Sequence, residues 1–339
     1  MTPLFLGLAG TTLSDAERGF FRDLDPAGFI LFKRNVEDPE KLRALTDSLR
    51  GLSGRDDLPI LIDQEGGRVA RMQPPHWPAF PKAELFDRLY DIAPMTAIEA
   101  ARHNAQAIAA MLRQVGINVD CLPLLDVRQP GAHDIIGDRA LGAEPLRVAA
   151  MGRAVIEGLR AGGAVGVVKH VPGHGRAMAD SHVELPVVDA GAEALETDLD
   201  PFIKLADAPM AMTAHVVYPA WDSEHCASLS PTIIADIIRG RIGFDGLLMS
   251  DDLGMHALTG DFGSRAAAVL AAGCDIALHC SGDMAEMEAI AQAVGPIGVA
   301  AQGRLARAMA TIQDSTSVAG VGVEELIAKR DALMAVLPA

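Results

Sequence analysis

Residues 167–182, VVKHVPGHGRAMADSH, concentrate side chains that bind metals or transfer protons. A lysine, three histidines and an aspartate lie around two glycines and a proline: Lys169, His170, His174, Asp180 and His182. Histidine is a common zinc ligand and also the side chain that most readily changes charge near neutral pH. The glycines and the proline indicate a loop that follows the apolar start of the segment. The segment could bind a metal ion or transfer protons. Alternatively, it is a surface loop without a chemical role.

The pair formed by Asp180 and His182 suits proton transfer. Residues two positions apart in an extended segment point to the same side, so the carboxylate of Asp180 can hold one nitrogen of the His182 imidazole. That contact fixes the tautomer and leaves the other nitrogen free to give or take a proton. By spacing alone Asp-x-His is a weak signal, and a solvated surface pair is more often the correct interpretation. The location of the loop over the barrel mouth would favour the catalytic interpretation.

A metal site would use His170, His174 and His182, with Asp180 as a further ligand. Metal-dependent barrel hydrolases usually carry a His-x-His pair at the end of the first strand, whereas residues 7–10 here are Gly-Leu-Ala-Gly. The ligands would also lie on a flexible Gly- and Pro-containing turn, which positions a metal poorly. We therefore expect no metal and no cofactor, and we expect His174 to shape the loop through hydrogen bonds.

A second constellation is LLMSDDLGMHAL, residues 247–258. Two adjacent carboxylates at the end of a buried strand are costly unless they have partners or take part in chemistry. Strand alternation sends Asp251 and Asp252 to opposite sides, so one of them is expected to face the site. We assign the chemical role to Asp251 and a supporting role, such as the N-cap of the next helix, to Asp252.

Eight apolar runs recur along the chain, and most of them end in polar residues. They cover 3–10, 28–35, 58–67, 118–127, 164–173, 208–219, 246–255 and 274–282. Continuous apolarity is typical of strands that are buried on both faces of a parallel sheet. With helical patterns between them, the runs predict an α/β fold, a (β/α)₈ barrel of the TIM type in a single domain over residues 1–339. A doubly wound sheet is the alternative, but the first strand is not followed by G-x-G-x-x-G.

Helix signals lie between the runs. Ser14 with Glu17 and Thr96 with Glu99 fit the capping box at a helix start. Ser230 before a proline also indicates a helix start. Residues after about 296 are expected to form terminal helices on the outside of the barrel.

The composition of the 339 residues limits the classes of molecule that the protein is expected to bind. A net charge of −16 disfavours nucleic acid, and no apolar run is long enough to span a membrane. The first residues lack the basic region of a signal peptide, so we expect a cytoplasmic location. The four cysteines fit reduced core residues in that compartment. We take the chain to be a monomer.

The carboxyl ends of barrel strands meet at one mouth, where barrel enzymes carry their active sites. The polar residues that end the apolar runs would meet there: Asp63, Glu65, Asp126, Lys169, His170, His215, Asp251 and Asp252. Asp138 and Arg139, in the loop GAHDIIGDRALG, could reach the same mouth.

Four motifs in this order resemble the glycoside hydrolase family 3 β-N-acetylhexosaminidases: IDQEGGRVARM, KHVPGHG…ADSH, MTAHVVYPAWD and MSDDLGM. The resemblance runs from about residue 5 to 285. It departs at Val171, where the family often has Phe, and at Gly254, where Ser is frequent. The resemblance implies that Asp251 is the nucleophile, His182 the acid/base group and Asp180 its orienting partner.

The resemblance also implies a set of residues that hold the hydroxyl groups of the sugar: Asp63, Arg71, Arg139, Lys169 and His170. Arg68 is a further candidate for binding the sugar hydroxyls. Alternatively, it is a structural ion-pair partner. His215 is expected to line the pocket or to lie just behind it.

The implied reaction is that of a retaining exo-β-N-acetylglucosaminidase acting through a covalent glycosyl-Asp251 intermediate. The substrate implied is a peptidoglycan fragment, GlcNAc-1,6-anhydro-MurNAc with or without peptide, in cell-wall recycling. Histidine as acid/base departs from the usual pair of carboxyl groups. A neutral base would also tolerate a phosphate acceptor, so phosphorolysis stays open beside hydrolysis. A sugar-binding protein without catalysis is a further alternative, although it would not need Asp251 together with the Asp180–His182 pair.

Overall fold

Eight parallel strands close into a barrel in the computed structural model, which describes residues 1–181, 183–312 and 322–338. Around the barrel the order is β1 (Thr2–Leu6), β10 (Ile276–His279), β9 (Leu247–Asp252), β6 (Met210–Thr213), β5 (Val165–Val171), β4 (Val119–Asp120), β3 (Ile60–Ile62) and β2 (Pro26–Leu31). Each strand overlaps one of the eight predicted apolar runs, and the predicted α/β barrel is confirmed. A small antiparallel hairpin, β7 (Val217–Tyr218) and β8 (Asp222–Cys226), lies between β6 and β9 in the chain.

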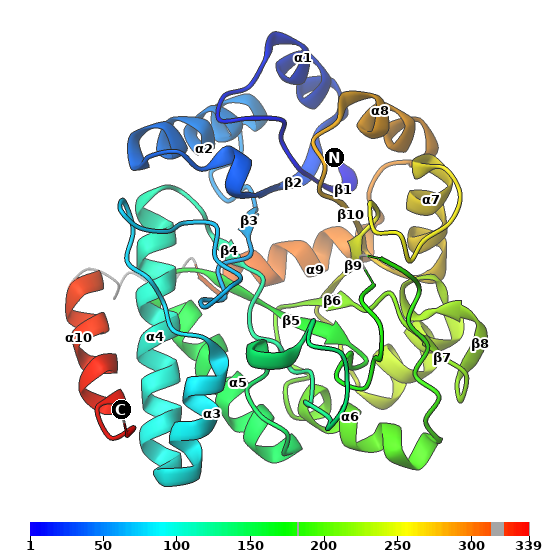
Figure 1. The fold of residues 1–339 in the computed structure, drawn as a ribbon. Coiled ribbons are helices and arrows are strands. Elements are labelled where there is room, and N and C mark those ends of the chain that lie inside the picture. Colours follow the sequence, from blue (N-terminus) through cyan, green and yellow to red (C-terminus); the bar gives the residue numbers. More distant parts are fainter. Residues whose placement is uncertain (182, 313–321, 339) are drawn as a thin grey trace.

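Helices surround the barrel (Figure 1). They are α1 (Asp15–Leu24), α2 (Pro39–Ser53), α3 (Ala83–Ile92), α4 (Pro94–Gln114), α5 (Pro145–Gly162), α6 (Ala192–Lys204), α7 (Phe262–Ala272) and α8 (Met284–Ala293). A π-helix at Ile233–Arg241 takes the place between β6 and β9. Short 3₁₀ turns at Lys33–Asn35, Gly137–Arg139 and Ala227–Leu229 complete the connections.

The predicted helix starts were right at two of three places. Ser14 accepts a hydrogen bond from the backbone of Glu17 at 3.2 Å, and its own N–H donates to the Glu17 carboxylate at 2.8 Å. Ser230 accepts from the backbone of Ile233 at 3.0 Å. The box at Thr96 was wrong, because α4 already begins at Pro94. A proline at the first helical position has the φ angle that the helix needs, and the N-cap is Ala93, three residues before Thr96.

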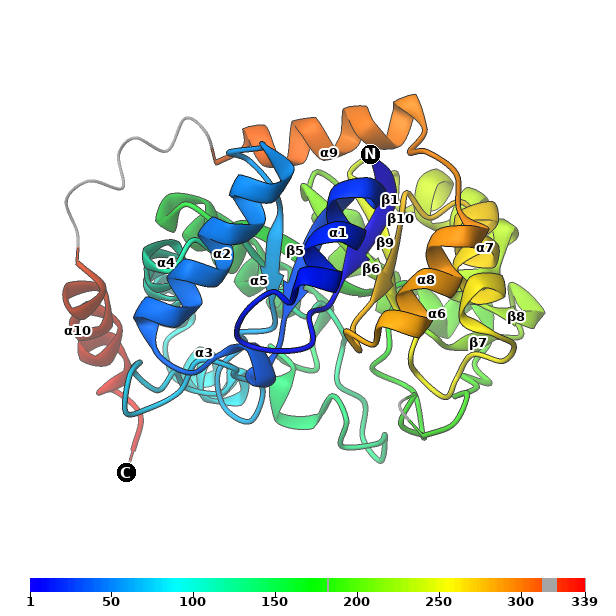
Figure 2. The same cartoon turned by 90° about the horizontal axis from the view of Figure 1, so that it is seen from above.

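The barrel interior is filled with apolar side chains, as expected for a packed core. Those facing inward include Phe5, Ile30, Leu61, Val167, Met210, Met249 and Ile276. Helix α9 (Val299–Ala310) crosses the amino-terminal end of the barrel (Figure 2), where Leu305 and Met309 join this interior cluster. Because the amino-terminal end is closed in this way, the polar strand ends are accessible only from the opposite end.

Helix α10 (Val323–Met334) packs on α4, and buried Arg330 donates to Asn104 at 3.0 Å. All four cysteines are buried free thiols. Among the residues that the structure describes, no helix is both long and apolar enough to cross a lipid bilayer.

Candidate active site

A cavity of about 270 Å³ lies at the carboxyl ends of the strands. Six of the residues predicted from the sequence line it: Asp63, Arg71, Arg139, Lys169, His170 and Asp251. They come from the ends of β3, β5 and β9 and from the turn at Gly137–Arg139. The barrel thus brings together side chains that are up to 188 positions apart (Asp63 to Asp251: 251 − 63 = 188).

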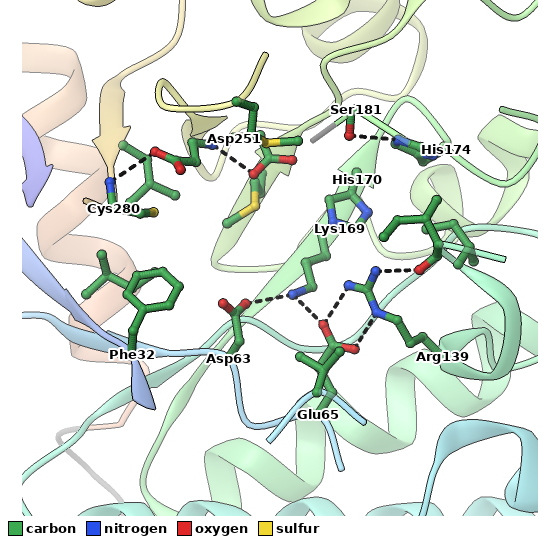
Figure 3. A pocket seen from close by; sticks show the side chains of 18 of the residues that line it. Phe32, Asp63, Glu65, Arg139, Lys169, His170, His174, Ser181, Asp251 and Cys280 are labelled. Atoms are coloured by element: carbon green, nitrogen blue, oxygen red, sulfur yellow. Dashed lines mark hydrogen bonds and ion pairs between the residues drawn. The ribbon is translucent and has the colours of Figure 1, made fainter. Parts of the chain in front are cut away.

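Lys169 is the centre of an ion-pair network in the wall of this cavity (Figure 3). Its ammonium group lies 3.0 Å from an oxygen of Asp63 and 2.7 Å from an oxygen of Glu65. Arg139 donates two hydrogen bonds of 2.8 Å to Glu65, and Arg71 donates one of 3.1 Å to Asp63. Three cations therefore surround two carboxylates, and the planar guanidinium of Arg139 gives Glu65 a fixed orientation.

The network keeps its charges although it is buried. Burial by itself would raise the pKa of Glu65, but Lys169 and Arg139 outweigh it and hold that pKa at about 2. In the same way, burial is outweighed at Asp63 by Lys169 and Arg71, which lower its pKa. Burial would lower the pKa of Lys169, yet the two carboxylates raise it above its usual value. Below the network, burial raises the pKa of Asp120, which favours its neutral form.

Asp126 orients the two histidines that precede the predicted catalytic loop. One of its oxygens lies 2.8 Å from Nδ1 of His170, and the other accepts from the backbone N–H of His174 at 2.7 Å. Burial opposes the ionised form of Asp126, but His170 lowers the pKa of Asp126 to about 2. A carboxylate on Nδ1 fixes the ring of His170 and directs the opposite edge away from Asp126.

The roles of Glu65 and Asp126 were missed by the sequence prediction. Both were expected at the barrel mouth as polar strand ends, but neither was given a role. The spacing of Asp63 and Glu65 was a usable signal, since residues two apart at the end of a strand point the same way. The contact of Asp126 with His170 carried no such signal, because it joins the segment after β4 to the neighbouring strand β5, 44 positions further along the chain.

Asp251 and Asp252 both contribute to the cavity at the tip of β9. Asp252 does support its surroundings, but not as a helix cap: its Oδ1 accepts from the backbone of Gly254 and of Cys280, each at 3.0 Å. The cap of α7 is Asp261, ten residues after Asp251 (261 − 251 = 10), because a turn separates β9 from that helix. Asp252 therefore fixes the turn beyond Asp251.

His215 lies behind the cavity rather than in its lining. It is fully buried, its Nδ1 is 2.7 Å from the hydroxyl of Ser228, and its Nε2 donates to the carbonyl of Asp252 at 3.0 Å. Burial lowers the pKa of His215, which favours its neutral form. Its role is to support the backbone at the tip of β9.

Arg68 lines the rim, yet its guanidinium is used within the protein. It donates to Asp138 at 3.0 Å and to the carbonyls of Asp134 and Ile135 at 2.7 Å each. These contacts tie β3 to the loop that carries Arg139. The structure therefore favours the structural interpretation of Arg68.

The loop from Gly173 to Ser181 leaves β5 beside the cavity. Gly173 has a φ of +132°, and a Cβ at Gly175 would overlap the carbonyl of Val127. Backbone conformation accounts for Gly173, and close packing against Val127 accounts for Gly175. Asp180 is partly buried on this loop, and His182, its predicted partner, lies outside the described residues.

The metal hypothesis relied on His170, His174 and His182. His170 directs Nδ1 to Asp126, and Nε2 of His174 faces the hydroxyl of Ser181 at 3.4 Å. Within residues 1–181, 183–312 and 322–338, no three His, Cys, Asp or Glu side chains are grouped so that they could hold a metal ion.

Comparisons with known proteins agree with this architecture. The family model described as "Glycosyl hydrolase family 3 N terminal domain" matches residues 6–314. A β-hexosaminidase of Aromatoleum aromaticum is 40% identical over 286 residues, which cover 82% of this chain and 79% of the relative. A β-hexosaminidase of Bordetella avium is 38% identical over 284 residues, which cover 82% and 80%.

Solved structures give the same result. Native NagZ from Neisseria gonorrhoeae superposes with a TM-score of 0.88 at 31% identity, over 98% of both chains. The same enzyme has been solved in complex with N-trifluoroacetyl-D-glucosamine, with the same score, identity and coverage.

Proposed function

Because the chain belongs to glycosyl hydrolase family 3 and is a β-N-acetylhexosaminidase, we propose that it removes terminal N-acetylglucosamine with retention of configuration, through a covalent intermediate on Asp251. The observation that carries the proposal is that Asp251 and the Lys169 network line one cavity, at the start of the loop that leads to His182. In this proposal a single carboxylate, Asp251, acts as the nucleophile on one face of the sugar, and the proton donor approaches the leaving oxygen from the loop.

In this mechanism Asp251 attacks the anomeric carbon while His182, as imidazolium, protonates the departing oxygen. The bond to the leaving group breaks and a glycosyl ester forms. His182, now neutral, then takes a proton from water, which attacks the ester and releases the sugar with its original configuration. Asp180 orients the imidazole, and its negative charge stabilises the imidazolium.

The sugar hydroxyls are assigned to Asp63, Arg71, Arg139, Lys169 and His170. Carboxylates accept hydrogen bonds from hydroxyls, and the cations donate to them, so the alternating charges of the network suit a polyol. The cavity is on the scale of one sugar ring, which supports removal of a single terminal residue. The NagZ of Neisseria gonorrhoeae forms a complex with a glucosamine derivative, which supports the same class of sugar.

The natural substrate that we propose is GlcNAc-1,6-anhydro-MurNAc, with or without peptide, in peptidoglycan recycling in the cytoplasm. We further propose a monomer whose catalytic domain spans residues 1–339. Cell fractionation, light scattering and release of N-acetylglucosamine from purified anhydro-muropeptides test these points.

The reaction is tested by comparing an aryl N-acetyl-β-glucosaminide with the matching aryl β-glucoside and following the first product by NMR. We expect the N-acetyl substrate to be preferred and the β-anomer to appear first. Initial formation of the α-anomer would refute a covalent intermediate with retention. A sugar 1-phosphate formed in phosphate buffer would indicate phosphorolysis in place of hydrolysis.

A further inference from the structure

Ser181 is buried, whereas two large apolar side chains near it in the sequence are exposed. This serine lies between Asp180 and His182 in the sequence and is 3% exposed, whereas Met178 is 67% exposed and Val183 69%. Serine is usually exposed, and methionine and valine are usually buried. The loop therefore exposes Met178 and Val183 and buries the hydroxyl of Ser181, which requires specific polar contacts inside.

Ser181 contacts two segments that follow different strands. Its hydroxyl lies 3.4 Å from Nε2 of His174, in the segment that follows β5 (Figure 3). Its carbonyl accepts from the backbone N–H of Ala257 at 3.3 Å, in the turn that follows β9 and Asp251. Ser181 thus joins the loop of the predicted acid/base pair to both sides of the cavity.

His174 is itself fixed, so it can serve as an anchor. Its backbone donates to Asp126 at 2.7 Å, its ring meets that of His170 edge to face at 5.7 Å, and the residue is only 3% exposed. Burial, followed by the neighbouring His170, lowers the pKa of His174 to about 4. The ring is therefore neutral at pH 7 and offers an acceptor nitrogen to a hydroxyl.

The beginning of the loop is anchored independently. The hydroxyl of Tyr218 donates to the carbonyl of Gly173 at 2.7 Å, and Arg176 pairs with buried Asp198 at 2.6 Å. Loss of the Ser181 hydroxyl would thus leave the start of the loop and the bond to Ala257 in place, and would remove the side-chain contact between Ser181 and His174.

We propose that His174 and Ser181 are positioning residues of the acid/base step, because their contact holds Ser181, the sequence neighbour of Asp180, in the lining of the cavity. The proposal rests on the proposed function of His182. Ser181 itself is not proposed to contact the substrate. The contact is proposed to affect the rate of proton transfer, because a misplacement of about 1 Å can lower a reaction rate about a hundredfold.

The test is a series of aryl N-acetyl-β-glucosaminides whose leaving groups range from 2,4-dinitrophenol to 4-methoxyphenol. For Ser181→Ala we expect kcat/KM to fall about tenfold or more on the poorest leaving group and less than about threefold on dinitrophenol, which needs no proton. Ser181→Thr, which restores a hydroxyl, should return the values to within about threefold of the wild type. An equal loss on all substrates would refute the positioning role, as would no loss.

Ser230→Ala is the matched control, because Ser230 is also a fully buried hydroxyl but bonds to Asp222 and Ile233. It should keep the leaving-group dependence of the wild type. His174→Gln is the second variant if Ser181→Ala fails to fold, as judged by circular dichroism, and it should show the same graded loss. A double variant that loses the product of the two single effects would contradict a shared contact.

His182→Ala separates this proposal from the proposed function. If His182→Ala is graded with leaving group and Ser181→Ala is not, only the positioning role fails. If Ser181→Ala is graded and His182→Ala is not, the assignment of His182 fails and the positioning role applies to another proton donor on the loop.

Discussion

Replacement of Glu65 by glutamine tests whether the buried ion-pair network contributes to stability. Glu65 has a pKa of about 2 in place of its ordinary 4.5. Each tenfold change in proton affinity corresponds to about 1.4 kcal/mol, so the ionised form contributes about 3 kcal/mol to folding at pH 7. The side chains of Glu65 and Arg139 are only 5% and 11% exposed, and solvent screening therefore removes little of this energy. Glu65→Gln should lose that amount at pH 7.

The pH dependence gives the sharper form of the test. Since the pKa of Glu65 is lower in the folded than in the unfolded chain, its contribution is complete above 4.5 and disappears as the pH falls through about 2. The difference in unfolding free energy between wild type and Glu65→Gln, measured by urea denaturation, should shrink from about 3 kcal/mol at pH 7 to about 2 near pH 3.5.

A matched control is Asp47→Asn, which removes an ion pair with Arg43 of similar length, 2.9 Å, but with both side chains half exposed. It should cost about 0.5 kcal/mol or less. A cost below about 1 kcal/mol for Glu65→Gln at pH 7 would refute the reasoning, because removing one partner of a buried pair should leave an uncompensated charge.

Three further predictions concern the site and its loop. Asp251→Ala should lower kcat by at least about a thousandfold with an unchanged circular dichroism spectrum. In the wild type, a 5-fluoro glycosyl donor should label Asp251, and label on Glu65 would overturn the assignment of the nucleophile. Arg68→Gln should change KM less than about threefold if Arg68 only holds the neighbouring loop, whereas a rise of about tenfold would indicate direct contact with the sugar. Burial, opposed by Arg176, raises the pKa of Asp198 to about 6. Because the folded form then binds the proton more tightly, the unfolding free energy of the wild type should fall by about 2 kcal/mol more than that of Asp198→Asn between pH 4 and 6, measured by denaturation.

The fold was predictable because its signal is local and repeated. A strand that is covered on both faces must be apolar at every position, and this pattern can be read without knowing any contact. The mouth of the barrel was predictable for the same reason, since polar residues such as Asp63 and Lys169 come directly after apolar runs. Both were found at the cavity.

The pairing of side chains was not predictable in this way. Lys169 meets Glu65 across 104 positions (169 − 65 = 104), and His215 meets the carbonyl of Asp252 across 37. Such contacts depend on the register of neighbouring strands, which a single sequence does not contain. The error at Asp252 has a related cause, because the length of the turn after β9 decides whether a carboxylate caps a helix or the turn itself.

The charges around the cavity bear on why histidine, rather than a carboxylic acid, would be the proton donor. Within the Lys169 network the cations Lys169, Arg71 and Arg139 outnumber Asp63 and Glu65 by one, and Asp251 and Asp252 add two carboxylates to the same cavity. Cations this close lower the pKa of a carboxylic acid, which would then hold no proton to donate at neutral pH. An imidazole titrates near ~6.5 without any rise in its pKa, and a neighbouring carboxylate stabilises its charged form. Under the proposed mechanism, a loop histidine beside an aspartate therefore suits proton donation beside these cations better than a glutamic acid, which would need a strongly raised pKa.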